Sequence, residues 1–111
     1  MTVVNRPRPD VTLTVSKDGQ SLKAGDVIHF SAVATDAVDG TLPASHFSWA
    51  IGLHHNSHTH PLLQLDEYDN GAFTVGDYSY ERGTLGIDLA LTVTNSAGLT
   101  TVVKKTWPIF A

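Results

Sequence analysis

The chain has 111 residues, of which 41% are hydrophobic and 16% are charged, so it has the length of one domain and enough apolar material for a core. Its formal net charge of -4 argues against a nucleic-acid partner, which would need a basic surface. The chain has no cysteine, which excludes disulfides and thiol chemistry. No apolar run approaches the roughly 20 residues that cross a bilayer, so we expect no membrane partner.

A lead-in precedes the predicted domain. Residues 5–10, "NRPRPD", are rich in proline and arginine, as linkers often are. We therefore interpret residues 1–9 as a linker and residues 10–111 as a single domain. The first residues lack the basic-then-apolar layout of a signal peptide. If the protein is secreted, we expect this chain to be a processed or excised piece of it.

The first half of the domain predicts strands rather than helices. Residues 11–15, "VTLTV", alternate apolar side chains with threonine, as a half-buried strand does. The β-favouring segment 27–35, "VIHFSAVAT", predicts a second strand. A third strand has the clearest alternation in the chain, because its large apolar residues all fall on one face: Phe47, Trp49, Ile51 and Leu53.

The second half repeats this pattern. A short strand is expected at 73–75, and strict alternation across 87–93 predicts a longer one. The turn sequence "NSAG" at 95–98 connects it to a final strand that starts at Leu99, and a short edge strand at 61–65 is left open. About seven short strands around a central tryptophan predict an antiparallel β-sandwich of the immunoglobulin-like type.

Three segments together carry a resemblance to a known family: "FSAVATDAVDGTLP" at 30–43, "FSWAIGLHHNSHTHP" at 47–61 and "LTVTNSAGLT" at 91–100. Over residues 7–108 the chain resembles the PKD-like, immunoglobulin-like modules of secreted bacterial sugar dehydrogenases of the glucose/sorbosone type and of other carbohydrate-active proteins. The histidine-rich stretch is the most specific part of the resemblance. Residues 77–88 depart from the pattern, in which a Trp-Tyr-Arg-Ile stretch leads into the strand.

The resemblance implies a function. It suggests a non-catalytic accessory module of a secreted, extracellular protein, in a carbohydrate-binding or spacer role. The implied partners are a polysaccharide or a neighbouring catalytic domain of the same chain.

The histidine-rich stretch is a candidate transition-metal site, formed by His54, His55, His58 and His60. On an extended backbone His58 and His60 share one face, and neutral imidazoles are ligands for zinc or copper. The alternative is a hydrogen-bonded loop in which some imidazoles pack on the core. A complete site would need a ligand from elsewhere, for which the candidates are Asp66, Glu67 and His46, the last expected on the outer face of the tryptophan strand.

Asp36 and Asp39 form a weaker candidate site for calcium. They flank a glycine-containing turn, "TDAVDG", and calcium prefers carboxylate and carbonyl oxygens. The alternative is a turn in which the aspartates bond to their own backbone.

Sugar binding by aromatic stacking is the third possibility. The candidates lie outside the strongest core strands and are Tyr68, Tyr78, Tyr80 and Trp107, with Phe110 beside them. Tyr78 and Tyr80 would share a face if their segment is extended. The alternative is that some of these rings close the ends of the sandwich.

Motifs for catalysis are missing from the sequence. It contains neither a Gly-x-Ser-x-Gly elbow nor a phosphate-binding glycine loop, and its carboxylates are scattered. An oxidative copper site built on the histidines is the one enzymatic possibility that the residues leave open.

Overall fold

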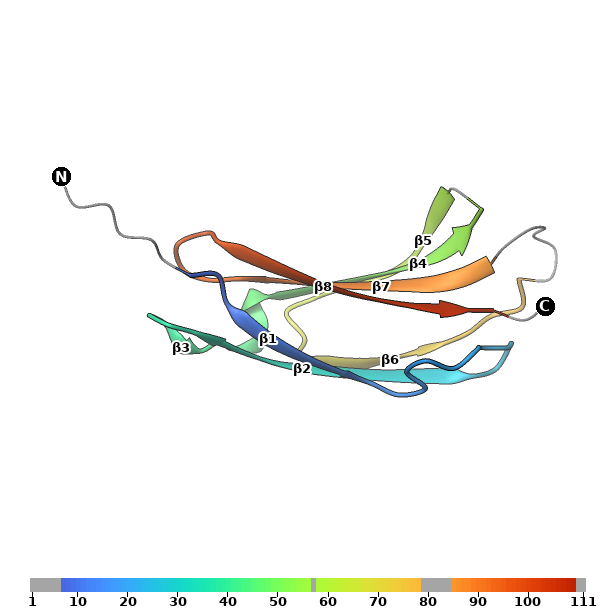
Figure 1. Ribbon diagram of the computed structural model, residues 1–111, viewed down its shortest axis with the longest axis horizontal. Helices are drawn as coiled ribbons and strands as arrows, with labels where there is room; N and C mark the ends of the chain where they lie inside the picture. The colour runs from blue at the N-terminus through green and yellow to red at the C-terminus, as the bar shows by residue number, and fades with distance from the viewer. Residues whose placement is uncertain (1–6, 57, 79–84, 110–111) are drawn as a thin grey trace.

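The computed structural model describes residues 7–56, 58–78 and 85–109, which form two antiparallel β-sheets packed face to face (Figure 1). The strands are β1 (Asp10–Val15), β2 (Val27–Asp36), β3 (Gly40–Thr41), β4 (Phe47–His55), β5 (His58–Asp66), β6 (Asn70–Thr74), β7 (Leu85–Thr94) and β8 (Thr100–Pro108). A short 3-10 helix, η1 (Ala44–His46), leads into β4. The predicted all-β sandwich is therefore confirmed.

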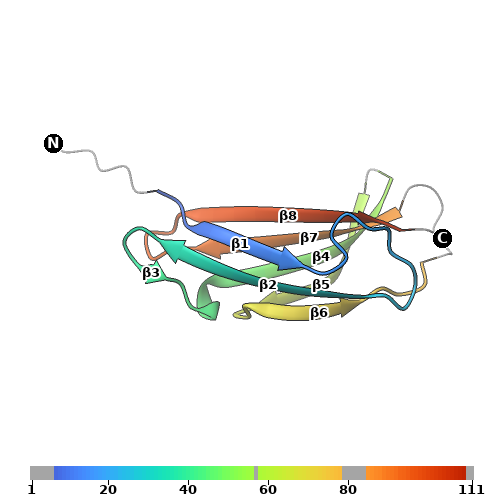
Figure 2. The ribbon, with the colours of Figure 1, turned by 60° about the horizontal axis from the view of Figure 1, so that its bottom comes forward.

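Each sheet contains four of the described strands. In the first sheet, β2 pairs with β1 along one edge and with β6 and β3 along the other. The second sheet has the order β5-β4-β7-β8. The chain changes sheets between β3 and β4, between β5 and β6, and between β6 and β7, so the two layers are linked in the manner of an immunoglobulin-like sandwich (Figure 2). The open question at 61–65 is settled, because these residues lie inside β5.

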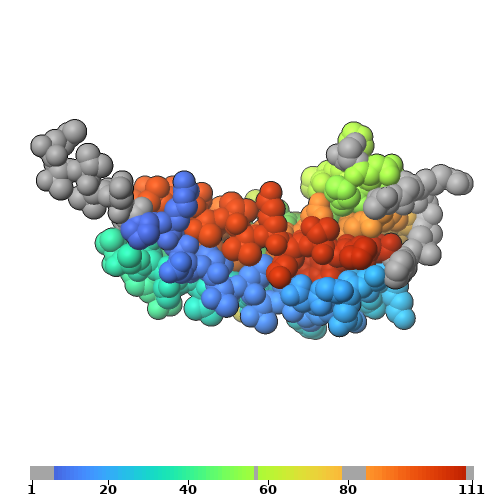
Figure 3. Space-filling view, in the orientation of Figure 1, coloured from blue at the N-terminus to red at the C-terminus, as the bar shows by residue number. Residues whose placement is uncertain are grey.

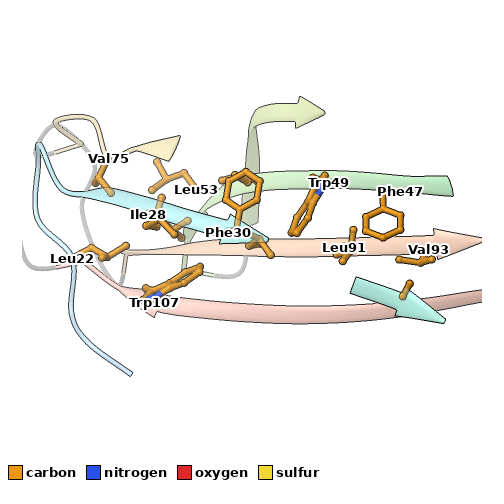
Figure 4. Close-up of a cluster of buried hydrophobic side chains, with 14 of the residues drawn as sticks. Leu22, Ile28, Phe30, Phe47, Trp49, Leu53, Val75, Leu91, Val93 and Trp107 are labelled. Atoms are coloured by element: carbon orange, nitrogen blue, oxygen red, sulfur yellow. The ribbon is translucent and has the colours of Figure 1, made fainter. Parts of the chain in front are cut away.

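The core between the sheets comes mainly from the alternation in β4 and β7. The predicted inward residues of both strands are buried: Phe47, Trp49, Ile51, Leu53, Ile87, Leu89, Leu91 and Val93. Trp49 is fully buried, and its ring centre lies 4.6 Å from that of Phe30 on β2 (Figure 4). Its indole Nε1 donates a 2.6 Å hydrogen bond to the backbone oxygen of Tyr68, which satisfies its one polar atom.

The two ends of the described chain lie at opposite ends of the sandwich. The backbone oxygen of Pro9, just before β1, accepts a 2.6 Å bond from Thr101 at the start of β8. β8 then runs along the sandwich, and the N–H of Ile109 donates to Leu85 at its far end (Figure 1). Within the described residues, no helical segment has the length and apolarity of a bilayer span.

Candidate functional site

The histidine-rich stretch forms the tip of a β-hairpin rather than a loop. His55 is the last residue of β4 and His58 is the first of β5, and the two are paired in register. His54 pairs with Thr59 in the same way. The alternative of a hydrogen-bonded loop does not describe these residues, because His54 and His55 continue the ladder of β4 with β5.

A β-bulge bends this hairpin. The pairing of β4 with β5 shifts between Ile51 and Gly52, where Leu63 and Pro61 are the successive partners. β5 approaches so closely at this point that a Cβ on Gly52 would lie 2.5 Å from Cγ2 of Thr59. Bulges bend a strand and increase its twist. The tip of the hairpin accordingly stands above the neighbouring surface of β8 (green against orange and red in Figure 3).

The hairpin divides the four histidines between its two faces. Residues opposite each other in a ladder share a face, so His55 and His58 lie together. His60 lies two positions after His58 on the same strand, so its side chain is on that face as well. The ring centres of His55 and His60 are 6.1 Å apart in a stacked arrangement. His54 lies on the other face, where its Nδ1 is 3.3 Å from Oδ2 of Asp88.

The predicted additional ligands lie away from the hairpin tip. Asp66 is at the opposite end of β5 and accepts hydrogen bonds from Ser48 (2.7 Å) and Gln64 (3.3 Å). Glu67 follows it and bonds through its backbone N–H to Phe47. Among the described residues, no three side chains of the metal-ligating types are gathered closely enough to hold an ion.

His46 does not occupy its predicted place on the tryptophan strand. It lies in η1, is half-buried, and its Nδ1 is 2.6 Å from the backbone oxygen of Thr94, to which it donates. The prediction extended the strand alternation one residue too far, because Pro43 introduces a helical turn before β4 begins.

Asp36 and Asp39 join two turns instead of surrounding an open site. Asp36 is 6% exposed, and its carboxylate accepts bonds from the N–H groups of Val38 and Asp39 (both 2.9 Å) and from Asn95 Nδ2 (2.8 Å). Asp39 accepts from the N–H and hydroxyl of Ser96, each at 2.8 Å. These bonds favour the hydrogen-bonded turn over the calcium site.

The aromatic candidates do not form one surface. Tyr68 is 55% exposed, whereas Tyr78 is half-buried and packs against the core. Trp107 is 1% exposed, and its Nε1 donates to the backbone of Lys17 (2.9 Å), so its proposed stacking role is wrong. Its place near Leu22 shows why, since a tryptophan at the end of β8 closes that end of the core (Figure 4). Tyr80 and Phe110 lie outside the described residues.

A groove of about 400 Å³ crosses the outer face of the β5-β4-β7-β8 sheet. Its floor is formed by the central strands β4 and β7, whose outward residues are mostly small, and its walls are formed by side chains of β5 and β8. We call this the outer groove; its lining includes Ala50, Gly52, Thr59, Pro61, Gln64, Asp88, Ala90, Lys104 and Thr106.

Asp88 is the main charged group on the floor of the outer groove. Its Oδ1 accepts from the hydroxyl of Thr106 at 3.2 Å, and its Oδ2 accepts from the hydroxyl of Thr59 at 3.4 Å. His54 approaches the same Oδ2, and the side chain of Asp88 remains 33% exposed. The bonds are long, which leaves this carboxylate able to exchange them for bonds to a ligand.

Sequence reasoning missed the outer groove, although a signal was present. Asp88 and Ala90 occupy the outward positions of the alternating segment 87–93, and Ala50 and Gly52 do so in the segment 47–53. Small or polar outward residues at the same level of two neighbouring strands predict a depression in the outer face. The pairing of Gly52 with Asp88 and of Ala50 with Ala90 places them side by side.

Comparison with known proteins gave no match: no family model, no curated protein and no solved structure matches this chain. The architecture of two antiparallel sheets agrees with the fold that the family resemblance implies, and the family itself stays a prediction.

Proposed function

We propose that this domain is a non-catalytic accessory module of an extracellular carbohydrate-active protein and that it binds polysaccharide in the outer groove. The observation that carries the proposal is the chemistry of the groove floor, where Asp88 accepts hydrogen bonds from the hydroxyl groups of Thr59 and Thr106. The outer groove is also lined by the small residues Ala50, Gly52 and Ala90. The sequence resemblance to modules of carbohydrate-active proteins supports the same choice.

The groove matches the chemistry of a sugar chain in two respects. A sugar ring presents hydroxyl groups that both donate and accept, and the groove offers an acceptor in Asp88, a donor in Lys104 and groups of both kinds in Gln64 and Thr106. The methyl groups of Ala50 and Ala90 supply the apolar contact that C–H surfaces of sugars need.

The proposal is tested by retention on insoluble cellulose, chitin and xylan. We expect the chain to be retained on at least one of them, and Asp88→Ala to weaken retention by about tenfold, as the loss of a charged hydrogen-bonding group does. Thr106→Ala should act in the same direction with a smaller effect.

Thr12→Ala is the matched control for Thr106→Ala, because Thr12 is an exposed strand threonine on the other sheet. It should leave retention unchanged. Polysaccharide binding in the outer groove is contradicted if no glycan retains the chain, or if Asp88→Ala is retained as well as the unaltered chain and the Thr12→Ala control.

The spacer role is favoured by a separate observation, the positions of Pro9 and Ile109 at opposite ends of the sandwich. Neighbouring domains attached beyond these two points would be separated by the length of the sandwich. Reporter domains fused at both ends should give a fixed, low energy-transfer efficiency and an unchanged melting temperature. A high efficiency, with the reporters in contact, would contradict the spacer role.

A further inference from the structure

We propose that the tip of the β4–β5 hairpin binds one transition-metal ion through His55, His58 and His60, and that His54 takes no part. This site is separate from the outer groove, and it stands or falls independently of polysaccharide binding.

The backbone pairing selects these three histidines. His55 lies directly across from His58, and His60 follows two positions later on the same strand, so all three side chains leave the same face of the hairpin. Directly opposite residues have Cβ atoms about 4.5–5.5 Å apart, which is within reach of two imidazoles on one ion. The ladder therefore fixes the positions from which the ligands approach.

Two of the three side chains, His55 and His60, are near the separation that an ion would need. A Zn–N bond is about 2.0–2.1 Å, which places the centres of two imidazoles on one ion about 5–6 Å apart. The rings of His55 and His60 are 6.1 Å apart and inclined by 27°. The three rings are not already arranged around a common point in the described residues. His58 and His60 are exposed, so they can turn toward His55 without disturbing the core.

His54 is not a ligand of this site, because it lies on the other face of the hairpin, beside Asp88. It pairs with Thr59 on the side of the hairpin that faces the outer groove, and its Nδ1 lies 3.3 Å from Asp88. A single ion cannot reach imidazoles on both faces of a two-stranded ribbon. His54 is thus a matched control, since it is the same residue type next to His55.

The ligand types decide which ions are bound. Three neutral imidazoles without a thiolate suit Cu²⁺, Ni²⁺ and Zn²⁺, with Cu²⁺ expected to bind most tightly. Hard cations such as Ca²⁺ prefer oxygen ligands, and the nearby carboxylate of Asp88 lies on the other face beside His54. We therefore expect selectivity for transition metals over Ca²⁺.

Calorimetric titration of the untagged chain with CuCl₂, ZnCl₂ and CaCl₂ tests the proposal. We expect one Cu²⁺ or Zn²⁺ per chain and none for Ca²⁺. His58→Ala and His60→Ala should each weaken Cu²⁺ binding by at least about tenfold, in the range found when one supporting group of a metal site is lost. His54→Ala and His29→Ala, the latter on the exposed face of β2, should leave the affinity unchanged.

Two results would overturn the proposal. One is the absence of heat with both Cu²⁺ and Zn²⁺, and the other is a loss of affinity in His54→Ala equal to that in His58→Ala. Paramagnetic broadening by Ni²⁺ gives a second readout, because the broadening of each imidazole signal reports how close that ring lies to the bound ion. The imidazole signals of His55, His58 and His60 should broaden at the lowest Ni²⁺ concentration and that of His54 only later; broadening of His54 first would also contradict the proposal.

Discussion

The two ends of this sandwich carry polar clusters of opposite character. At one end, Asp36 and Asp39 bond to Asn95 and Ser96, and the turn before β3 is joined to the turn between β7 and β8; we call this the turn pair. At the other end, the hairpin of β4 and β5 extends from the sheet and carries its histidines at the surface. Both clusters suggested cation sites in the sequence.

Burial accounts for the difference between the two clusters. Asp36 and Asn95 are 6% and 3% exposed, and a buried polar group is costly unless it is hydrogen-bonded. The turn pair supplies those bonds from within the chain. The exposed imidazoles at the hairpin tip can be solvated by water, so the fold does not require protein partners for them. The aspartates of the turn pair are therefore explained by the hydrogen bonds that they make within the fold. The exposed histidines of the hairpin tip, His58 and His60, have no such structural role to fill, so they can serve to bind a ligand.

The largest effect is expected from breaking the turn pair at its buried member. Asp36→Ala removes the acceptor for two backbone N–H groups and for Asn95, which remains buried. We expect the free energy of unfolding to fall by about 3 kcal/mol, measured by urea denaturation. Asp39→Ala, at the exposed member of the turn pair, should cost about 1 kcal/mol or less. Equal losses for the two variants would contradict the role given to burial.

At the hairpin end, the close approach of the two strands at Gly52 can be tested by adding one methyl group. The Cβ of Gly52→Ala would meet Cγ2 of Thr59 at 2.5 Å and the backbone oxygen of His60 at 3.2 Å. We expect the free energy of unfolding to fall by about 2 kcal/mol, in the range of overpacking substitutions. The β-branched side chain of Thr59 has few alternative rotamers, so it cannot easily turn away from the added methyl group.

The double variant Gly52→Ala with Thr59→Ser is the control for this effect. It removes Cγ2 and keeps the hydroxyl, so it should recover part of the lost stability in the same urea experiment. If Thr59→Ser recovers nothing, the clash at Cγ2 is not the cause.

The histidines themselves should contribute little to stability. His58 and His60 are exposed, and substitutions at such positions are usually within about 0.5 kcal/mol. We expect the metal-free double variant His58→Ala, His60→Ala to unfold at nearly the same urea concentration as the unaltered chain. A loss comparable to that of Asp36→Ala would show that the hairpin end depends on its polar side chains as the turn pair does.

The sequence predicts the parts of this molecule that follow from strand alternation. The inward faces of β4 and β7 were read correctly because burial on one side of a sheet imposes a period of two. β5 was left open over residues 61–65 and was not predicted over its histidines, since those histidines, Pro61 and a bulge interrupt that period. The role of Trp107 was wrong for a different reason, namely that the packing partners of a residue near the end of the chain come from segments distant in sequence, such as Lys17.

The division of the histidines between two faces was only half predictable. That His58 and His60 share a face follows from their spacing. That His55 joins them while His54 does not depends on the turn at Asn56 and on the register of β4 with β5, neither of which alternation specifies. The contact between His54 and Asp88 requires, in addition, the pairing of β4 with β7.

The smallest effect on the free energy of unfolding is expected at Asp66. Like that of Asp36, its carboxylate accepts hydrogen bonds from side chains, but it is exposed. Hydrogen bonds from the Ser48 hydroxyl and, to a lesser extent, the Gln64 amide hold the pKa of its carboxyl below the ordinary value. A lowered pKa in the folded state stabilises the fold at pH above the ordinary value of an aspartate, and this contribution is lost as the pH falls through the lowered pKa. Because Asp66 is exposed, we expect little change in unfolding free energy and a clear change in titration.

Ser48→Ala should therefore raise the pKa of Asp66 toward its ordinary value, measured by NMR titration of its side-chain carboxyl carbon. Gln64→Ala should raise it less, because the hydroxyl bond is the shorter of the two, at 2.7 Å against 3.3 Å. A larger rise in Gln64→Ala than in Ser48→Ala would contradict the prediction that Ser48 has the stronger influence on the pKa of Asp66. An unchanged pKa in Ser48→Ala would mean that exposure to water removes the effect of a side-chain donor, and the contrast with Asp36 would then rest on burial alone.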